Sequence, residues 1–532
     1  MLLISILGWG LSMYLASQYA PNESKNNRRA LLYTISIESE LAEAATLQEK
    51  WQALTDPLSK YPPLFYISAL LARAITWTED DRLASLSMML AFFLALSFGF
   101  YLLLRVKLNS DWAILGTALF CTAPGILVLA RVFSPTFPCM ALLALALGIA
   151  AKTEPFKRVP ATLALAVVCG AGLMFYYSML VFLIGPVLFS FILALRENPS
   201  RYLRVLALSV MFLLVAALIC APYYLSDDFI QWAYARFEIF FIPEGETEGQ
   251  DYALPLRALY VFFDYSVRLL KTLWESEFPI LLLFVVLGRR KLKPNFNGWM
   301  LWLRPNHVGG MLASTLLISL SFFSLYGTKN IDYVMPLYPV FAYPFCAALS
   351  GEFFSKRRAL TVGLAVFAMI LGVSVTLISF PRFPQRMVDE VIDPLVQECR
   401  GADPPCIVAA YYCNDFTNVL LQVNRGWDPE RMLIKNPPAP ENGGPPAERI
   451  DFILIEKKRG AVGKPDAGLK PFNQPCAVIP EYDLQTGEVI RLTHYGRDVT
   501  DLFEIRSRAD GSDKSLILYR RKDRRNRLPG EE

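Results

Sequence analysis

Long apolar runs without charged residues alternate along this chain with short polar connections. A helix needs about 20 apolar residues to cross the hydrocarbon core of a bilayer. Runs of single-span length are Met1–Pro21, Leu83–Leu104, Trp112–Ala130, Val132–Ala151, Val205–Ser226, Val308–Thr328, Tyr333–Gly351 and Ala359–Pro381. The run Val159–Leu195 is long enough for two spans that turn near Phe175–Ser178, and the shorter run Phe278–Gly288 extends backwards over Trp274. The pattern therefore predicts eleven transmembrane helices.

Basic residues gather in alternate connections, as expected for loops on the cytoplasmic side. The five basic loops carry Arg105 and Lys107; Lys152, Lys157 and Arg158; Arg196, Arg201 and Arg204; Arg289, Arg290, Lys291 and Lys293; Lys356, Arg357 and Arg358. The opposite short connections hold little beyond Arg131 and Lys329. This asymmetry predicts an N-terminus inside and, with eleven spans, a C-terminus outside.

The first apolar run has two interpretations. No basic residue precedes it, and Arg28 and Arg29 follow it, so it could be a signal peptide with a poor cleavage site at Ser17–Ala20. Its length favours a retained helix, because the apolar part of a signal peptide is shorter.

Three longer polar segments, 20–81, 227–277 and 382–532, then share the outer face. In the first, apolar residues recur at helical spacing around Leu41–Trp51 and predict an amphipathic helix, either on the membrane surface or packed on the protein. In the last, Val388–Cys399 favours a helix, and four runs have strand character: Ile407–Tyr412, Val419–Val423, Phe452–Glu456 and Leu516–Tyr519. The expected fold is an α-helical polytopic membrane domain over residues 1–380, followed by an extracytoplasmic α/β domain over 382–532.

Composition supports a membrane protein and excludes several other classes. Of 532 residues, 54% are hydrophobic and 19% charged, below the share of about 25% charged in soluble proteins. The net charge of +4 is too small to indicate nucleic-acid binding. Two distant histidines argue against zinc sites and histidine-based triads. Phosphate-loop, HExxH, dinucleotide-binding and GxSxG motifs are absent from the sequence.

The nine cysteines fall into two groups. Those in apolar runs are expected to be small core residues: Cys121, Cys139, Cys169, Cys220 and Cys346. The other four, Cys399, Cys406, Cys413 and Cys476, lie in the polar C-terminal part, where disulfides form if that part is outside the cytoplasm. Cys399 and Cys406 flank a tight turn and are the pair favoured to meet.

One stretch, Ser59–Tyr66, joins the first polar segment to an apolar run. Pro62 and Pro63 cannot continue a helix, and they force an extended conformation on the residue before them. Lys60, Tyr61 and Tyr66 crowd the same place. This stretch, which we call the elbow, is predicted to be a rigid turn at the depth of the lipid headgroups.

Candidate chemistry on the outer face comes from three kinds of residue. A transfer reaction there needs a carboxylate base and cations for a phosphate leaving group. Carboxylates of the first segment are Glu23, Glu38, Glu40, Glu43 and Asp56, and cations at comparable depth are Lys60, Arg131 and Lys329. Tyr61, Tyr66, Tyr333 and Tyr338 offer rings and hydroxyls suited to a sugar or headgroup. Singly, each is typical of an interfacial anchor; the prediction depends on their sharing one face.

Three motifs resemble those of the GT-C membrane glycosyltransferases, in particular the bacterial protein O-mannosyltransferase and lipid A aminoarabinose transferase group. Lys60–Tyr66 is similar to the K-P-P-L-x-Y element with a tyrosine inserted before the prolines. Lys329–Pro339 is similar to the K/R-x-x-x-Y-x-x-P-x-x-P element, and Ala221–Tyr224 to A-P-W-Y. The resemblance covers about residues 1–380.

The resemblance implies inverting transfer of a sugar from a polyprenyl phosphate, with a carboxylate of the first loop as base. Glu23, in Pro21-Asn22-Glu23, or Glu40 would deprotonate the acceptor. Lys329, with Arg131 or Lys60, would bind the donor phosphate, and Tyr61, Tyr66, Tyr333 and Tyr338 would line the pocket. The chain departs from the family where Ser134-Pro135-Thr136 carries no acid after Arg131, and where Tyr177-Ser178-Met179 replaces T-K-G.

The sequence thus predicts a polyprenyl-phosphate-dependent glycosyltransferase in the bacterial cytoplasmic membrane. Its expected partners are a lipid-linked sugar donor and a lipid, glycan or protein acceptor. We expect no cofactor and identify no metal ligands. The alternative is a non-catalytic GT-C-like protein that binds or flips a lipid-linked glycan.

Overall fold

The computed structural model describes residues 1–18, 31, 33–34, 37–38, 40–55, 61–76, 81–153, 156–226, 229–230, 307–325, 334–347, 358–379, 391, 394–395, 398, 408–411, 433–435, 449–458, 478–482, 489–494, 497–510 and 514–522. The chain divides into two compact units. Unit 1 comprises Met1–Leu15, Tyr33–Trp77 and Leu83–Ser379; unit 2 comprises Ala16–Leu32, Thr78–Arg82 and Phe380–Glu532.

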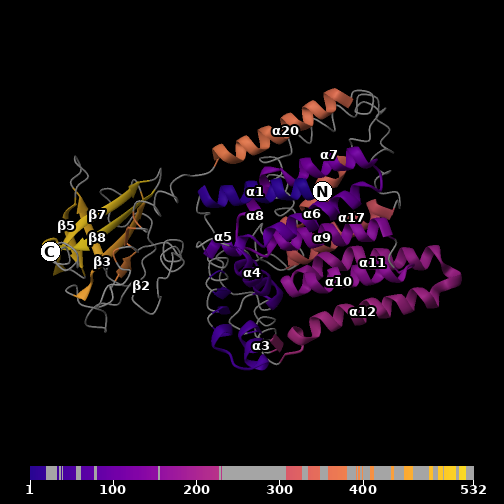
Figure 1. The fold of residues 1–532 in the computed structure, drawn as a ribbon, viewed down its shortest axis with the longest axis horizontal. Coiled ribbons are helices and arrows are strands. Elements are labelled where there is room, and N and C mark those ends of the chain that lie inside the picture. Colours follow the sequence, from indigo (N-terminus) through magenta and orange to yellow (C-terminus); the bar gives the residue numbers. More distant parts are fainter. Residues whose placement is uncertain are drawn as a thin grey trace, which may run out of the picture. The chain divides into compact units, whose positions relative to one another are not determined.

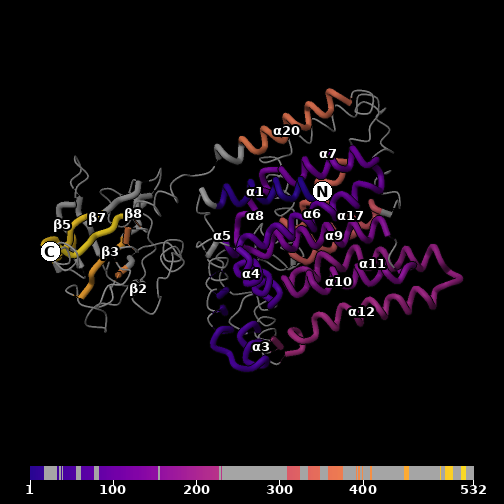
Figure 2. Tube along the Cα trace, viewed as in Figure 1, coloured from indigo at the N-terminus to yellow at the C-terminus, as the bar shows by residue number. Residues whose placement is uncertain are grey.

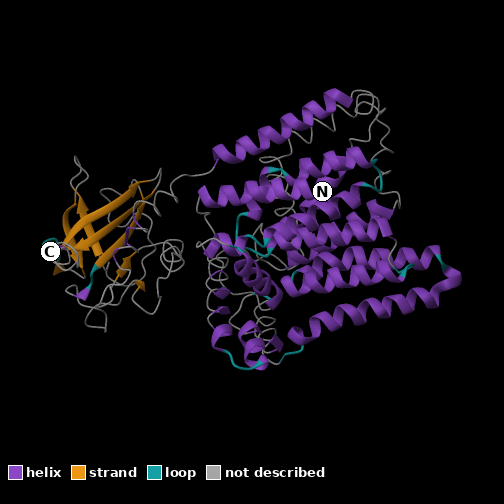
Figure 3. Cartoon of the chain, in the orientation of Figure 1, coloured by secondary structure: helices purple, strands orange, loops and turns teal. Residues whose placement is uncertain are grey.

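Helices make up the described part of unit 1 (Figures 1 and 3). They are α1 Leu2–Gln18, α3 Leu47–Thr55, α4 Pro63–Ile75, α5 Asp81–Leu86, α6 Met89–Leu104, α7 Ser110–Cys121, α8 Pro124–Ala130, α9 Thr136–Thr153, α10 Val159–Phe175, α11 Met179–Glu197, α12 Tyr202–Tyr224, α17 His307–Leu325, α18 Tyr338–Ala347 and α20 Arg358–Ser379, with the 3₁₀ turns η1 Pro199–Arg201 and η3 Met335–Leu337.

Apolar helices lie over all the expected spans except Phe278–Gly288, which is outside the described residues. The division of 159–195 into two helices is confirmed, because α10 ends at Phe175 and α11 begins at Met179. By length and composition, four described helices could cross a membrane, or five if the bent pair α7–α8 is one span. The total of eleven stays a prediction.

The span expected over Trp112–Ala130 is bent rather than one continuous helix. The helix breaks between α7 and α8, which meet at 59°. Ala123 is extended and Pro124 begins α8, because proline has no N–H to donate back into the preceding turn. Because of this bend, α8 runs in a different direction from α7 and ends at Ala130, next to Arg131.

Small residues allow the bundle helices to approach closely. On Gly99 of α6, a Cβ atom would collide with the backbone of Ala144 and Leu145 in α9. At α1, the Ser5 hydroxyl lies 2.7 Å from the Ser97 hydroxyl of α6, so α1 packs against α6. The five cysteines expected in the core are buried thiols. Close approach and buried hydroxyl contacts are typical of helix packing in membranes.

The helix bundle of unit 1 has two chemically different ends. Figure 2 traces the chain through this unit. At one end, Lys157 pairs with Glu197, and Arg358 pairs with Asp111. At the opposite end, ring contacts join Phe93 to Phe137 and Phe92 to Phe175. We call these the basic end and the aromatic end. The elbow, the α8–α9 connection and the α10–α11 turn all lie at the aromatic end.

The first polar segment does not form one helix around Leu41–Trp51. Residues 40–43 are helical, residues 44–46 are not, and α3 begins at Leu47. Thr46 and Glu49 cap α3: the Glu49 amide donates to Thr46 Oγ1 at 3.2 Å, and the Thr46 amide donates to Glu49 Oε2 at 3.0 Å. This Thr-x-x-Glu capping box starts a new helix at this point.

Unit 2 contains two sheets. Five strands follow the order β2-β1-β3-β8-β7 and three follow β4-β5-β6. Their bounds are β1 Val408–Tyr411, β2 Leu433–Lys435, β3 Phe452–Lys458, β4 Val478–Tyr482, β5 Val489–His494, β6 Arg497–Asp498, β7 Phe503–Asp510 and β8 Lys514–Arg521. In the larger sheet β1 is parallel to β2 and β3, and β8 is antiparallel to β3 and β7.

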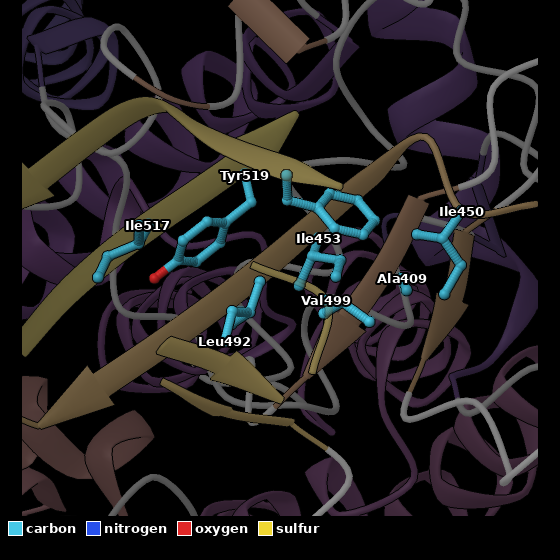
Figure 4. Packing of buried hydrophobic residues seen from close by; sticks show 8 residues of the cluster. Ala409, Ile450, Ile453, Leu492, Val499, Ile517 and Tyr519 are labelled. Carbon is cyan, nitrogen blue, oxygen red and sulfur yellow. The ribbon is translucent and has the colours of Figure 1, made fainter. Parts of the chain in front are cut away.

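The two sheets share one apolar core, shown in Figure 4. Leu492 of β5 packs in the same cluster as Ile453 of β3 and Tyr519 of β8. Strands β1, β3 and β8 coincide with three of the expected strand runs, whereas 419–423 and the four C-terminal cysteines lie outside the described residues. The limits 1–380 and 382–532 and the extracytoplasmic side of the second domain stay predictions.

Candidate functional site

The elbow folds as its prolines require. Pro62 is extended (φ −61°, ψ 155°) and caps α4, and Pro63 takes the first helical position, where a missing N–H costs nothing. The elbow's aromatic side chains point inward: Tyr61 is 3% exposed and Phe65 and Tyr66 are fully buried. Lys60 lies outside the described residues. The predicted rigid turn is therefore present, and its rings are packed against the protein.

Arg131 lies at the end of α8, in the connection to α9. Arg131 is only 7% exposed, whereas arginines of the basic end such as Arg201 are exposed. The nearby Ser134 and Thr136 are also buried, and their hydroxyls lie 2.9 Å apart. A buried guanidinium in a membrane domain is costly and marks a candidate functional position.

Ring contacts bring the elbow and the Arg131 connection together. Phe65 of α4 and Phe133, two residues after Arg131, have ring centroids 4.9 Å apart. Phe65 also contacts Tyr61 at 5.2 Å and Tyr66 at 5.5 Å. The aromatic wall of the elbow is thus fixed directly beside the arginine connection.

The α10–α11 turn joins the same cluster. Tyr176 meets Tyr61 edge-on at a centroid distance of 5.8 Å, and Tyr177 is 4.7 Å from Tyr176. We call Tyr61, Phe65, Tyr66, Phe133, Tyr176 and Tyr177 the elbow cluster. Leu64 of the elbow packs against a buried cluster formed by Met174, Cys220 and Tyr223, so the end of α12 adjoins the elbow.

The second proline-rich motif is described only from Val334 onward. Within it, Val334 and Leu337 are fully buried and Tyr338 is 2% exposed, and η3 packs against α9. Lys329 and Tyr333 lie outside the described residues. Tyr338 is therefore placed as a packed residue next to α9, the helix that follows Arg131.

Of the two candidate bases, Glu40 is the one among the described residues. Glu40 lies exposed on the helical segment 40–43, and Glu23 is outside the described residues. Glu38 forms an ion pair with Arg73 in the last turn of α4, with Arg73 Nε 2.8 Å from Glu38 Oε2. This pair ties the first polar segment to α4, the helix that the elbow begins.

Sequence reasoning did not select Phe133, Tyr176 and Tyr177 as site residues. Phe133 is hidden in a continuous apolar run, and no periodicity reveals which ring it meets. The tyrosine pair carried a usable signal, because Tyr176-Tyr177-Ser178 is a polar interruption between two charge-free runs at the predicted turn.

The arrangement suits a phosphate attached to a long apolar chain. A buried guanidinium offers several N–H donors to phosphate oxygens, and such charge-assisted hydrogen bonds are strong where water is excluded. Aromatic and aliphatic side chains next to it offer an apolar surface. The features brought together are Arg131, Phe133 and the elbow.

Comparison with known proteins identifies the fold. No protein-family model and no curated protein matches the sequence. Among solved structures, the chain is similar to ArnT from Cupriavidus metallidurans in the apo state, with a TM-score of 0.55 and 13% identity over 97% of this chain and 96% of that chain. The ArnT structure bound to undecaprenyl phosphate gives a TM-score of 0.53 at 12% identity over the same shares. The chain has the GT-C fold.

The chain is also similar to the apo oligosaccharyltransferase of Archaeoglobus fulgidus, with a TM-score of 0.47, 13% identity and coverage of 85% of this chain and 69% of that chain. The GT-C fold and the apolar helices make this chain a multi-pass membrane protein. The fold alone assigns neither substrate nor catalytic residues.

Proposed function

We propose that this chain is a glycosyltransferase that moves a sugar from a polyprenyl-phosphate donor to an acceptor outside the cytoplasm. The observation that carries the proposal is the buried Arg131 beside the elbow cluster, in a fold shared with ArnT over 97% of the chain. That the ArnT structure can hold undecaprenyl phosphate supports a lipid phosphate as the ligand of this fold.

The proposed reaction breaks the bond between the sugar's anomeric carbon and the phosphate oxygen. The electron pair stays on the phosphate, whose charge Arg131 stabilises together with Lys329 or Lys60. An acceptor hydroxyl or amine forms the new bond to the anomeric carbon from the opposite face. This attack from the opposite face inverts the configuration at the anomeric carbon. The acceptor's proton passes to Glu23 or Glu40, which balances the charge.

The remaining candidates have supporting roles in this proposal. Tyr61 and Tyr66 of the elbow, with Tyr333 and Tyr338 of the second motif, line the donor site through rings and hydroxyls. No cofactor takes part, and assaying turnover in the presence of a chelator measures whether the reaction needs a metal ion. The protein lies in the bacterial cytoplasmic membrane with its N-terminus and basic end inside and residues 382–532 outside.

The test is donor consumption by purified protein. Polyprenyl phosphates carrying different sugars are incubated with bacterial membranes as a source of acceptors, and free polyprenyl phosphate is measured by mass spectrometry. We expect release that is lost in Arg131→Gln and retained in Arg201→Gln, an exposed arginine of the basic end. Glu23→Gln and Glu40→Gln identify the base, because the variant that lacks the base should lose turnover and still bind the donor. Equal turnover in all variants would exclude these assignments.

A second candidate function is supported by the Arg131 connection itself. Ser134 and Thr136 stand where the related enzymes carry an acid, and their hydroxyls bond to each other. A protein that binds or flips a lipid-linked glycan without transferring it would need the cation but not the acid. Donor binding that depends on Arg131, with no turnover of any donor, would favour this candidate.

A further inference from the structure

An ion pair attaches the first polar segment to the end of α4. Nε and Nη2 of Arg73, in the last turn of α4, both donate to Glu38 Oε2, at 2.8 and 2.5 Å. The Arg73 side chain is 11% exposed and the Glu38 side chain 50% exposed. Fully exposed ion pairs contribute little to stability, whereas a cation as buried as Arg73 needs its counter-charge. We therefore expect this pair to hold more firmly than the exposed pair of Arg358 and Asp111 at the basic end.

The helix α4 is itself fixed at both ends. At its start, Phe65 packs against Phe133 in the α8–α9 connection. At its end, the Thr76 hydroxyl lies 2.6 Å from the hydroxyl of Ser87, just before α6. Arg73 follows Phe65 by eight residues, which places it about 12 Å farther along the helix axis. A segment attached to Arg73 is therefore kept at a fixed distance from the α8–α9 connection.

The first polar segment is anchored on both sides of Glu40. Before it, Thr34 and Ile37 are buried, and their spacing of three residues places them on one face of a helix, next to Glu38. After it, α3 packs against α4 (Figure 1). Glu40 thus lies between two attachments to the helix that the elbow begins, only two residues after the ion pair.

The turn that carries Glu40 depends on these attachments. Glu40 is exposed, and residues 44–46, which follow its turn, are not helical. Short exposed segments open locally unless contacts on their flanks hold them. A general base must lie within hydrogen-bond reach of the proton that it takes. Because a displacement of about 1 Å can slow a reaction about a hundredfold, an anchor two residues from a base affects its rate.

From this geometry we propose that Arg73 is a positioning residue of the transfer reaction: through Glu38, it holds the turn that carries Glu40 in place relative to the elbow. Arg73 acts on the base without touching the reacting atoms. The inference rests on the proposed function, and it selects Glu40 over Glu23 as the base. Loss of either partner releases the same turn, so the effects of losing Arg73 and Glu38 should not add.

The test compares turnover of the full chain in nanodiscs, assayed with the polyprenyl-phosphate sugar that the wild-type protein consumes. We expect Arg73→Gln and Glu38→Gln each to lower kcat about tenfold and to leave KM for the donor unchanged, because the donor phosphate still has its cations. The double variant should lose no more than either single one. Arg73→Lys keeps the charge and should recover part of the turnover. Arg358→Gln, which breaks the exposed pair at the basic end, should change neither constant.

Amide hydrogen exchange measures the attachment without any donor. Amides of residues 40–43 should exchange faster in Glu38→Gln than in the wild-type protein, and amides of α9 should exchange at the same rate in both. The inference is overturned if exchange at 40–43 does not change, if both single variants keep wild-type turnover, if their losses add in the double variant, or if Glu40→Gln keeps full turnover. A wild-type protein that consumes no donor would instead contradict the proposed function, while faster exchange in Glu38→Gln would still show that the pair holds the segment.

Discussion

The ring of Phe65 lies 4.9 Å from the ring of Phe133, centroid to centroid, and both side chains are fully buried. Phe65 belongs to the helix that the elbow begins, and Phe133 follows Arg131 by two residues. This contact sets the position of a buried cation relative to an aromatic wall, and the proposed donor site depends on it.

Removal of the Phe133 ring should destabilise unit 1 and weaken donor binding together. Phe133→Ala leaves a cavity among fully buried rings, for which about 3 kcal/mol is typical. The measurement is the unfolding midpoint in detergent, paired with the affinity for undecaprenyl phosphate. Phe98→Ala serves as the control, because Phe98 is 49% exposed and should tolerate truncation with little change. Equal losses in both variants would show that the elbow contact has no special role.

The close approach of α6 and α9 should not tolerate a side chain at Gly99. A Cβ atom there meets backbone atoms of Ala144 and Leu145, which cannot move aside as a flexible side chain would. Gly99→Ala is expected to cost about 1–3 kcal/mol, the usual range for overpacking. Gly363→Ala in α20 is the matched control: a Cβ there meets nothing within 4 Å, and the change should be neutral or stabilising through helix propensity. Thermal unfolding of the two variants in the same detergent checks this difference.

The capping box of α3 makes the start of that helix sensitive to pH. Hydrogen bonds from the amides of Thr46 and Ala45 hold the pKa of the Glu49 carboxyl below its usual value of 4.5. A lowered pKa in the folded state means that the stabilisation is present above the unfolded pKa and is lost as the pH falls through the folded one. Amide hydrogen exchange at the start of α3, corrected for intrinsic rates, should therefore accelerate as the pH drops below 4.5. In Glu49→Gln, which does not titrate, this acceleration should vanish; an identical pH profile in both proteins would contradict the assignment.

The elbow could be predicted from sequence because its cause is local. Two adjacent prolines restrict the backbone wherever they occur, and Pro62 and Pro63 end one segment and begin α4 as expected. The division between α10 and α11 was predictable for a similar reason, since the apolar run is too long for one span.

The break between α7 and α8 and the contacts of the elbow cluster could not be predicted in the same way. Hydropathy is continuous across Thr122–Pro124, so a count of apolar residues passes over the 59° bend. The contact between Tyr61 and Tyr176 depends on which helices pack together. Helical periodicity indicates which face of a helix is buried but not which element packs against it. Glu23, Lys60, Lys329 and Tyr333, which complete the predicted site, lie outside the described residues and stay predictions.

The most direct test of the proposed donor site is the affinity of the purified chain for undecaprenyl phosphate, measured with and without the Arg131 guanidinium. We expect Arg131→Gln to weaken binding at least about tenfold and Arg131→Lys to recover part of it, because lysine keeps the charge but loses bidentate geometry. Arg201→Gln, at the basic end, should bind as the wild-type protein does. Unchanged affinity in Arg131→Gln, in a protein that unfolds at the wild-type midpoint, would contradict the proposed site.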